Sequence, residues 1–379
     1  MLPALLFAAA IAVVNGFGRF AYGLLLPVMR DDLAWDYALS GWLNTANSLG
    51  YGVGALLALV LLARYRPATL FVGGLCMTVA TLLMCSFTLD LSWMMLWRFA
   101  SGVGSAWVFA CGGALVALRY RADPARAGSA IAIYYAGGGL GLAASGVLLY
   151  PVLNGAWAWS TGWLVLGVAG LVLSLAPGWL ALQTGGPAPV RTANPEALPL
   201  RRFRVILTAY FLFGVGYIVY LTFVVAWLRE MRLGVDATVG LWVLMGLAVM
   251  ASGYVWRGVM ARWWAVHTFA AATLCTAVGT ALPLVSASVP VLLASVVLVG
   301  GSFFMAPGAM MALARAALPQ AQWALTMNLF TFIFAIGQGI GPVAAGWVAD
   351  TYGMNWAMLA GAVVLVVAAG LALLQRREV

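Results

Sequence analysis

Twelve long apolar runs separated by short polar connections constrain this chain more than any other feature of its sequence. A helix needs about 20 mainly apolar residues to cross the hydrocarbon core of a bilayer. Apolar residues make up 65% of the 379 residues and charged residues only 8%, which excludes both a soluble domain and a disordered chain because each needs more charge. The sequence therefore predicts an all-α integral membrane protein with twelve transmembrane helices, at 5–28, 39–63, 68–89, 91–118, 127–153, 157–182, 204–228, 237–260, 264–286, 290–314, 321–349 and 354–374.

The distribution of arginine predicts how these helices are oriented. All 19 basic residues are arginine; 14 fall in the even-numbered connections and the C-terminal tail, and three in the odd-numbered connections. Cytoplasmic loops of membrane proteins carry an excess of basic residues, so both termini are predicted to be cytoplasmic. The net charge of +9 is spread between apolar runs, which favours an orientation signal over a nucleic-acid-binding surface.

A polar connection after the sixth run divides the chain almost in half. Residues 183–202 contain four prolines and a pair of glycines, a composition typical of a flexible linker. The predicted organisation is an N-terminal six-helix bundle at 1–182, a cytoplasmic linker at 183–202 and a C-terminal six-helix bundle at 203–379.

The two halves also repeat one another at an offset of 200 residues. The segments 137–146 (GGGLGLAASG) and 337–346 (GQGIGPVAAG) are identical at five of ten positions. Small residues spaced four apart let membrane helices approach closely, and chance similarity between glycine-rich helices is the alternative for any single pair. Two related halves with a site between them are the architecture of secondary transporters.

These motifs resemble the major facilitator superfamily over essentially the whole chain. The segment RFASGVG at 98–104 is similar to the family's fourth-helix motif, and the glycines of the fifth run to its fifth-helix motif, although Leu142 replaces the usual proline. The segment GFGRFAY at 16–22, followed by Leu26 and Pro27, resembles a YbfB/YjiJ-like branch of bacterial permeases. The resemblance implies a permease of the bacterial inner membrane, built from two pseudo-symmetric bundles that work by alternating access.

One departure concerns the loop after the second run. The family carries an aspartate there that helps to latch the two halves on the cytoplasmic side, whereas this loop reads ARYRP at 63–67. The latch is therefore expected to be weaker or to use other acceptors. The residues expected to take part in conformational change are Arg64, Arg66, Gly137, Gly141, Gly337, Gly341 and Pro342.

Arg19 and Arg98 are the ionisable residues well inside predicted helices, and such residues are functional candidates by default. Arg19 lies about 12 Å and Arg98 about 10 Å from the outer end of its helix, at 1.5 Å per residue. No predicted helix holds a carboxylate at that depth to neutralise them. Together they are expected to form a charged clamp for a carboxylate or phosphate; the alternative is that each binds helix carbonyls and braces the bundle.

Polar and aromatic residues on the same set of helices are expected to complete a substrate-binding site. For each of them the alternative is an interhelical hydrogen bond, worth about 0.6 kcal/mol on average. These residues are Asn15, Tyr22, Asn44, Asn47, Trp107, Tyr134, Tyr217, Tyr220, Asn328 and Gln338.

The expected function is transport of a small organic or oxyanionic anion, by a monomer in the bilayer. The absence of acids from the helix interiors favours exchange or facilitated diffusion over proton coupling. A proton-coupled drug or metabolite exporter is the first alternative, and a receptor or assembly subunit that moves nothing is the second. The chain has no nucleotide-binding loop, catalytic triad or metal-ligand spacing around His267, its single histidine, so no enzyme activity, metal or cofactor is expected.

Overall fold

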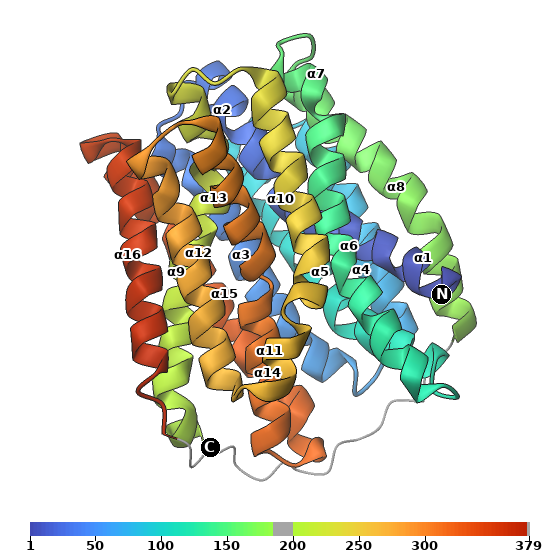
Figure 1. The fold of residues 1–379 in the computed structure, drawn as a ribbon. Helices are drawn as coiled ribbons and strands as arrows, with labels where there is room; N and C mark the ends of the chain where they lie inside the picture. Colours follow the sequence, from blue (N-terminus) through green and yellow to red (C-terminus); the bar gives the residue numbers. More distant parts are fainter. Residues whose placement is uncertain (185–199, 377–379) are drawn as a thin grey trace.

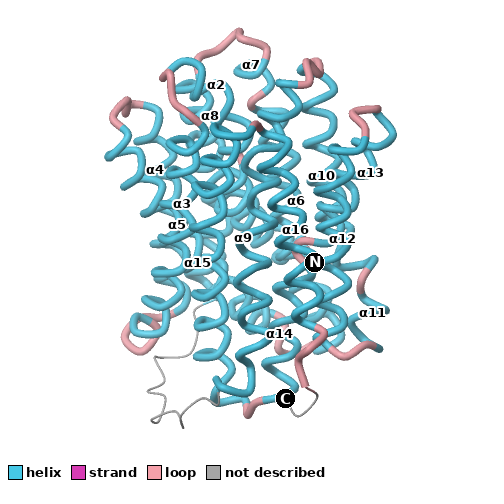
Figure 2. Tube along the Cα trace, turned by 90° about the vertical axis from the view of Figure 1, so that its left-hand side faces the viewer, coloured by secondary structure: helices cyan, strands magenta, loops and turns pink. Residues whose placement is uncertain are grey.

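The computed structural model describes residues 1–184 and 200–376, and these residues are helical apart from short turns (Figures 1 and 2). The first half contains α1 (Leu2–Ile11), η1 (Ala12–Phe20), α2 (Tyr22–Asp32), α3 (Tyr37–Leu61), α4 (Pro67–Ser86), α5 (Leu91–Arg119), α6 (Pro124–Leu148), α7 (Tyr150–Leu153) and α8 (Trp159–Thr184). The second half contains α9 (Leu200–Glu230), α10 (Val235–Val255), α11 (Arg257–Arg262), α12 (Ala265–Val285), α13 (Val289–Ser302), α14 (Met305–Ala317), α15 (Gln320–Tyr352) and α16 (Met354–Ala372).

These helices confirm the twelve spans expected from the sequence. Among the described residues, 12 helical segments are long and apolar enough to cross a membrane. The first, Leu2–Asp32, combines α1, η1 and α2, and the tenth, Val289–Ala317, combines α13 and α14. Hydrocarbon offers no partner to a backbone N–H or C=O, so a span must bond its backbone internally, as a helix does. The expected linker falls mainly on residues 185–199, which lie outside the described residues.

Aspartate side chains determine where two of the spans begin. Asp36 Oδ1 accepts a hydrogen bond from Leu39 N at 2.6 Å, and Asp90 Oδ1 accepts one from Trp93 N at 3.1 Å. Each N-cap satisfies an N–H that the first helical turn leaves unpaired. Helix α4 instead begins with Pro67, which has no N–H to satisfy.

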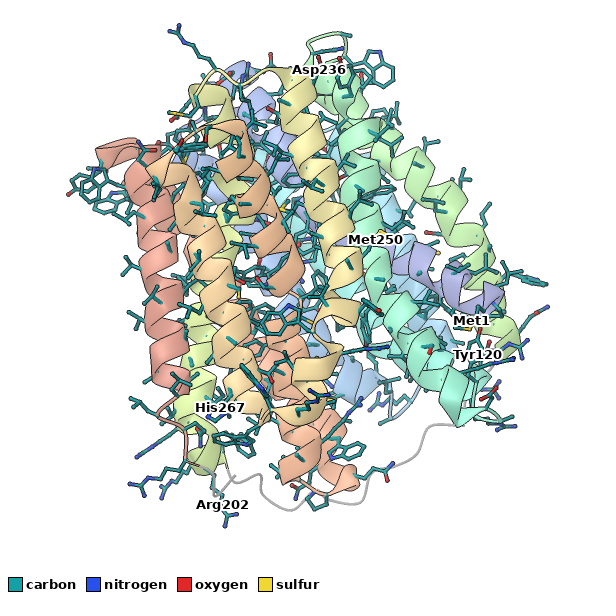
Figure 3. The ribbon with its side chains drawn as sticks, viewed as in Figure 1. Met1, Tyr120, Arg202, Asp236, Met250 and His267 are labelled. Atoms are coloured by element: carbon teal, nitrogen blue, oxygen red, sulfur yellow. The ribbon has the colours of Figure 1, made fainter. Side chains whose placement is uncertain are left out.

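The two ends of the bundle differ in charge. Arg202 and His267 lie at one end and Asp236 at the other (Figure 3). We call the first the arginine-rich end, because the described connections and helix ends there carry Arg64, Arg66, Arg119, Arg121, Arg126, Arg201, Arg202, Arg204, Arg257, Arg262, Arg315 and Arg376. We call the second the acid-rich end; it carries Asp31, Asp32, Asp36, Asp90, Glu230, Asp236 and Asp350.

The repeated glycines are packing positions within each half. A Cβ atom on Gly137 or Gly141 of α6 would overlap the backbone of α1 or η1, and one on Gly337 or Gly341 of α15 would overlap the backbone of α9. Equivalent glycines thus allow close packing of membrane helices in both halves, as small residues generally do. Their part in conformational change stays a prediction.

Three pairs of helices form the main contacts between the halves. Helix α3 runs beside α15, α6 beside α10, and α2 beside α9. On the first pair, a Cβ on Gly41 would meet the backbone of Pro342; on the second, a Cβ on Gly139 would overlap the backbone of Gly246. Within the described part of the chain, the hydrogen bonds and ion pairs between halves lie at mid-depth or toward the acid-rich end.

Candidate functional site

The first span contains the irregularity on which the candidate site is built. Over η1 the backbone hydrogen bonds widen to π-helical spacing, and Ala21 N donates to Gly16 O at 2.8 Å. All residues of η1 are buried. The apolar run at 5–28 predicts one regular helix here, whereas the π-helical turn displaces carbonyls that need other donors. Asn15, Gly16 and Gly18, which have low helix propensity, are the signal that marks this segment.

Arg98, on α5, binds the backbone of η1. Its Nη1 donates to Gly18 O at 2.5 Å and its Nη2 to Arg19 O at 3.3 Å. Its guanidinium carbon lies 5.4 Å from the ring centroids of both Tyr22 and Trp163, and the residue is 1% exposed. This is the bracing geometry that the sequence analysis gave as the alternative to substrate contact.

Two serines on the same face of α5 also bind carbonyls of η1. Ser105 Oγ donates to Val14 O at 3.0 Å, and Ser101 Oγ lies 3.4 Å from Gly18 O. Neither serine is among the candidate residues expected from the sequence. Their spacing of three and seven residues from Arg98 places all three side chains on one helical face, a signal that was present in the sequence.

Arg19 points toward the other half of the protein. Its Nη2 donates to Gln338 Oε1 of α15 at 2.8 Å, and Gln338 Nε2 donates to the hydroxyl of Tyr217 on α9. The guanidinium carbon lies 4.1 Å from the ring centroid of Tyr51, and Arg19 is 5% exposed. These residues form a link between the halves at mid-depth; sequence reasoning identified all of them except Tyr51.

No carboxylate neutralises Arg19 among the described residues, because none of their ion pairs includes it. Contacts with aromatic faces contribute about 0.5–2 kcal/mol each, and Gln338 Oε1 is a neutral acceptor. A buried cation without a counter-charge is unfavourable. The site is therefore electropositive as it stands.

Aromatic side chains from both halves surround the link. The ring of Phe20 meets Phe303 edge-on with centroids 5.9 Å apart, and Phe303 stacks with Tyr217 at 5.6 Å. Tyr217 also stacks with Phe213 at 4.9 Å. The surroundings of Arg19 are thus mainly aromatic and buried, which strengthens electrostatic interactions because little water can screen them.

Two predicted asparagines join helices beside this site. Asn44 Nδ2 donates to Thr222 Oγ1 of the other half at 2.6 Å. Asn47 Nδ2 donates to Arg98 O at 3.0 Å, so Asn47 supports the same brace as Arg98.

The remaining candidates bind their own half or have no partner. Four of them form hydrogen bonds within their own half: Tyr22 with Ser40 O, Tyr134 with Val108 O, Tyr220 with Ser295 Oγ, and Asn328 with Ala324 O. Two buried atoms, Asn15 Oδ1 and Trp107 Nε1, have no hydrogen-bond partner within the described chain. Arg64 and Arg66 are exposed at the arginine-rich end.

At the acid-rich end, Asp350 of the second half binds the start of α3 in the first. Its Oδ1 accepts a hydrogen bond from Tyr37 N at 2.9 Å, and its Oδ2 accepts one from Ala38 N at 2.8 Å. A carboxylate at a helix N-terminus also interacts favourably with the helix dipole. This contact is not among those expected from the sequence.

Two further polar contacts close the same end. Arg229 Nη1 lies 2.9 Å from Asp31 Oδ2, and Tyr37 OH donates to Glu230 Oε1. Arg30 also pairs with Asp31, at 2.9 Å. The acid-rich end is thus held closed by groups that come from both halves.

Comparisons with known proteins agree with this architecture. Residues 11–373 match the family described as "Uncharacterised MFS-type transporter YbfB". The uncharacterized MFS-type transporter YceJ of Bacillus subtilis (strain 168) is 29% identical over 255 residues, which cover 64% of this chain and 62% of that relative's length.

Solved structures show the same fold at low sequence identity. A bacterial homologue of the human lysosomal transporter Spinster, inward-facing and unoccupied, has a TM-score of 0.71 at 16% identity, covering 99% of this chain and 96% of that one. A point mutant of the nucleoside transporter NupG has a TM-score of 0.77 at 15% sequence identity, and the match covers 99% of each chain. The human organic anion transporter MFSD10 has a TM-score of 0.71 at 13% sequence identity, and the match covers 98% of each chain. The family match spans nearly the whole sequence, and the chain therefore belongs to the YbfB family of MFS-type membrane transporters.

Proposed function

We propose that this protein is a secondary transporter that moves a small organic anion across the bacterial inner membrane by alternating access. The observation that carries this proposal is the state of Arg19: a permanent positive charge, buried between the halves, whose hydrogen bond goes to the neutral Gln338. An anion at this position supplies the missing counter-charge. The forked guanidinium matches the geometry of a carboxylate or phosphate.

The link from Arg19 through Gln338 to Tyr217 couples binding to the arrangement of the halves. An anion that takes Arg19 Nη2 displaces Gln338 Oε1 and so removes a side-chain bond between the bundles. A ligand shifts a conformational equilibrium only through different affinities for the two states. The bond between Arg19 and Gln338 exists while the acid-rich end is closed. An anion that competes for Arg19 must break this bond in the closed state, so its affinity differs between the closed and open states.

The rings around Arg19 favour an organic anion over an inorganic one. Tyr51 and Phe20 present ring faces to the guanidinium, and Phe303 packs against Phe20. A hydrated inorganic ion gains little from such surfaces, whereas the carbon skeleton of an organic acid gains from burial against them.

The energy source that we propose is the gradient of the substrate or of an exchanged anion, since no acid lies near Arg19 in the described chain. Proton-coupled export is the second candidate, and one observation favours it: Asp31, Glu230 and Asp350 form contacts between the halves at the acid-rich end. A protonophore added to loaded proteoliposomes separates the two, because it stops a proton-coupled exporter and leaves anion exchange running.

We further propose that the protein acts as a monomer and that the arginine-rich end faces the cytoplasm. The orientation rests on the excess of arginine at that end. Labelling with an impermeant reagent at single cysteines introduced near Arg66 and near Asn154 tests it.

The substrate class is tested by thermal unfolding of the purified protein with carboxylates, phosphates, nucleosides and cationic drugs. We expect organic anions to raise the unfolding temperature and cations to leave it unchanged. Any stabilising compound is then tested on Arg19→Gln, with Thr331→Ala as the control, because Thr331 lies on the same helix as Gln338 but bonds its own backbone. Arg19→Gln should abolish the shift in unfolding temperature, and Thr331→Ala should keep it.

Transport of the identified anion into proteoliposomes completes the test. If Arg19→Gln keeps both the wild-type rate and affinity, the anion site proposed here is wrong. If only cationic compounds stabilise the wild type, the exporter is the better assignment.

A further inference from the structure

A groove of about 670 Å³ lies between α12 and α16, at the arginine-rich end of the second half. Small residues on both helices leave this space open: Ala270 and Ala271 on α12, and Ala369 and Gly370 on α16. A Cβ on Gly370 would have no neighbouring atom within 4 Å. The volume is within the range of about 300–1,000 Å³ found for small-molecule sites.

The walls of the groove face the hydrocarbon. Leu274, Val366 and Leu373 line it, and their side chains are 47%, 51% and 57% exposed. Leu274 and Val366 belong to helices that span the membrane, and Leu373 directly follows the end of α16, so the apolar surface they expose contacts lipid tails. An acyl chain fits such walls, whereas a water-soluble solute would lose its hydration there.

The end of the groove lies at the level of the lipid headgroups. Arg262, Trp263, Trp264 and His267 line it there. Tryptophan is enriched at the membrane–water interface, and the rings of Trp264 and His267 meet edge-on with centroids 5.4 Å apart. Arg262 is exposed and has no ion pair within the described residues, so its charge is available to a ligand.

We propose that this groove binds one anionic phospholipid of the leaflet at the arginine-rich end, with the headgroup phosphate on Arg262 and one acyl chain over Gly370. Charge complementarity identifies the class of lipid, because basic pockets between membrane helices bind anionic headgroups. The apolar walls identify the ligand as a lipid and not a free phosphate. The groove lies outside the Arg19 site, so this proposal is independent of the transported substrate.

Native mass spectrometry of the full-length protein in detergent tests the headgroup contact. Phosphatidylglycerol and phosphatidylcholine with the same acyl chains are compared as probes. We expect the wild type to prefer phosphatidylglycerol and Arg262→Gln to bind it about fivefold more weakly, the effect of one basic residue at the membrane surface. Arg262→Lys should keep most of the preference. Arg257→Gln is the control, since Arg257 lies at the same end on α11, outside the groove.

Filling the groove tests the acyl-chain contact. Gly370→Leu places a side chain in the open space, where its Cβ would have no neighbour within 4 Å, and it should weaken binding of both lipids. Gly253→Leu is the control, because Gly253 on α10 has equally open surroundings and lies outside the groove.

Three outcomes would overturn the proposal. The first is equal binding of the two lipids by the wild type, and the second is loss of the preference in Arg257→Gln to the same extent as in Arg262→Gln. The third is displacement of the lipid by inorganic phosphate at millimolar concentration, which would identify a site for the free ion. Thermal unfolding of every variant verifies folding, and none of these readouts depends on transport activity.

Discussion

Arg19 Nη2 lies 2.8 Å from Gln338 Oε1, although the two residues are 319 positions apart and belong to opposite halves of the protein. The bond joins η1 to α15 at mid-depth, where a cation has no acidic partner among the described residues. This contact relates the charge of the candidate site to the relative position of the two bundles.

Replacing Arg19 should remove anion binding while leaving the fold intact. A hydrogen bond to a charged group contributes about 1.5–3 kcal/mol, so Arg19→Gln should weaken binding of the identified anion about 10- to 100-fold. The affinity of Arg19→Lys for the anion should lie between those of the wild type and Arg19→Gln, because an ammonium keeps the charge but lacks the planar fork of a guanidinium. Titration by thermal shift or calorimetry measures both values. Wild-type affinity in Arg19→Gln would exclude Arg19 from the site.

Replacing Arg98 should instead weaken the fold. The guanidinium donates to Gly18 O and Arg19 O, and a buried acceptor that loses its partner costs about 1–3 kcal/mol. Arg98→Met should therefore lower the unfolding temperature, while the folded protein keeps its affinity for the anion. The opposite result, an unchanged unfolding temperature with lost affinity, would make Arg98 a substrate ligand.

Removing the charge of Asp350 should favour opening of the acid-rich end. Asp350 accepts hydrogen bonds from Tyr37 N and Ala38 N across the halves. Asparagine keeps one acceptor oxygen but lacks the negative charge and the second acceptor, and a hydrogen bond contributes about 1 kcal/mol. Asp350→Asn should thus raise the ratio of open to closed protein about fivefold. Spin labels at exposed Asn154 and Ser288, in a variant without the four native cysteines, measure the distance distribution.

Asp90→Asn is the matched control for that experiment. Asp90 caps α5 by accepting from Trp93 N, and both residues belong to the first half. Its substitution likewise removes a negative charge at a helix N-terminus, without touching a contact between halves. A similar shift in the distance distribution in Asp90→Asn would mean that the effect of Asp350 is not specific to the closure.

The contact between Tyr150 and Asp236 predicts a response to alkaline pH. Tyr150 OH donates to Asp236 Oδ1 of the other half at 2.7 Å, and this bond to the carboxylate raises the pKa of the Tyr150 phenol. The closed arrangement is then favoured in full below the ordinary tyrosine pKa of about 10. Its advantage is lost as pH rises through the raised pKa.

A difference absorbance titration between wild type and Tyr150→Phe isolates the phenolate of Tyr150. Its midpoint should lie above that of an exposed tyrosine, and Asp236→Asn should bring it down. A midpoint that does not respond to Asp236→Asn would show that the two side chains are not bonded in solution.

The division of the chain into twelve spans could be predicted from the sequence because each membrane helix satisfies its own backbone hydrogen bonds and needs only a sufficient apolar length. The repeated glycines could be found for a similar reason, since close packing requires a small residue wherever two helices touch. The π-helical η1 could not be predicted in this way, because its displaced carbonyls are stabilised by Arg98, Ser101 and Ser105 of another helix.

The sequence by itself determined that two arginines lie inside the membrane, because a charge within an apolar run is visible without any knowledge of the fold. It did not distinguish them. Only the tertiary structure brought the guanidinium of Arg98 to the carbonyls of η1 and that of Arg19 to Gln338 of the opposite half. The same holds for Asp350 and the start of α3. The partner of a buried charge is set by which helices pack together, and that packing depends on contacts between residues far apart in the chain.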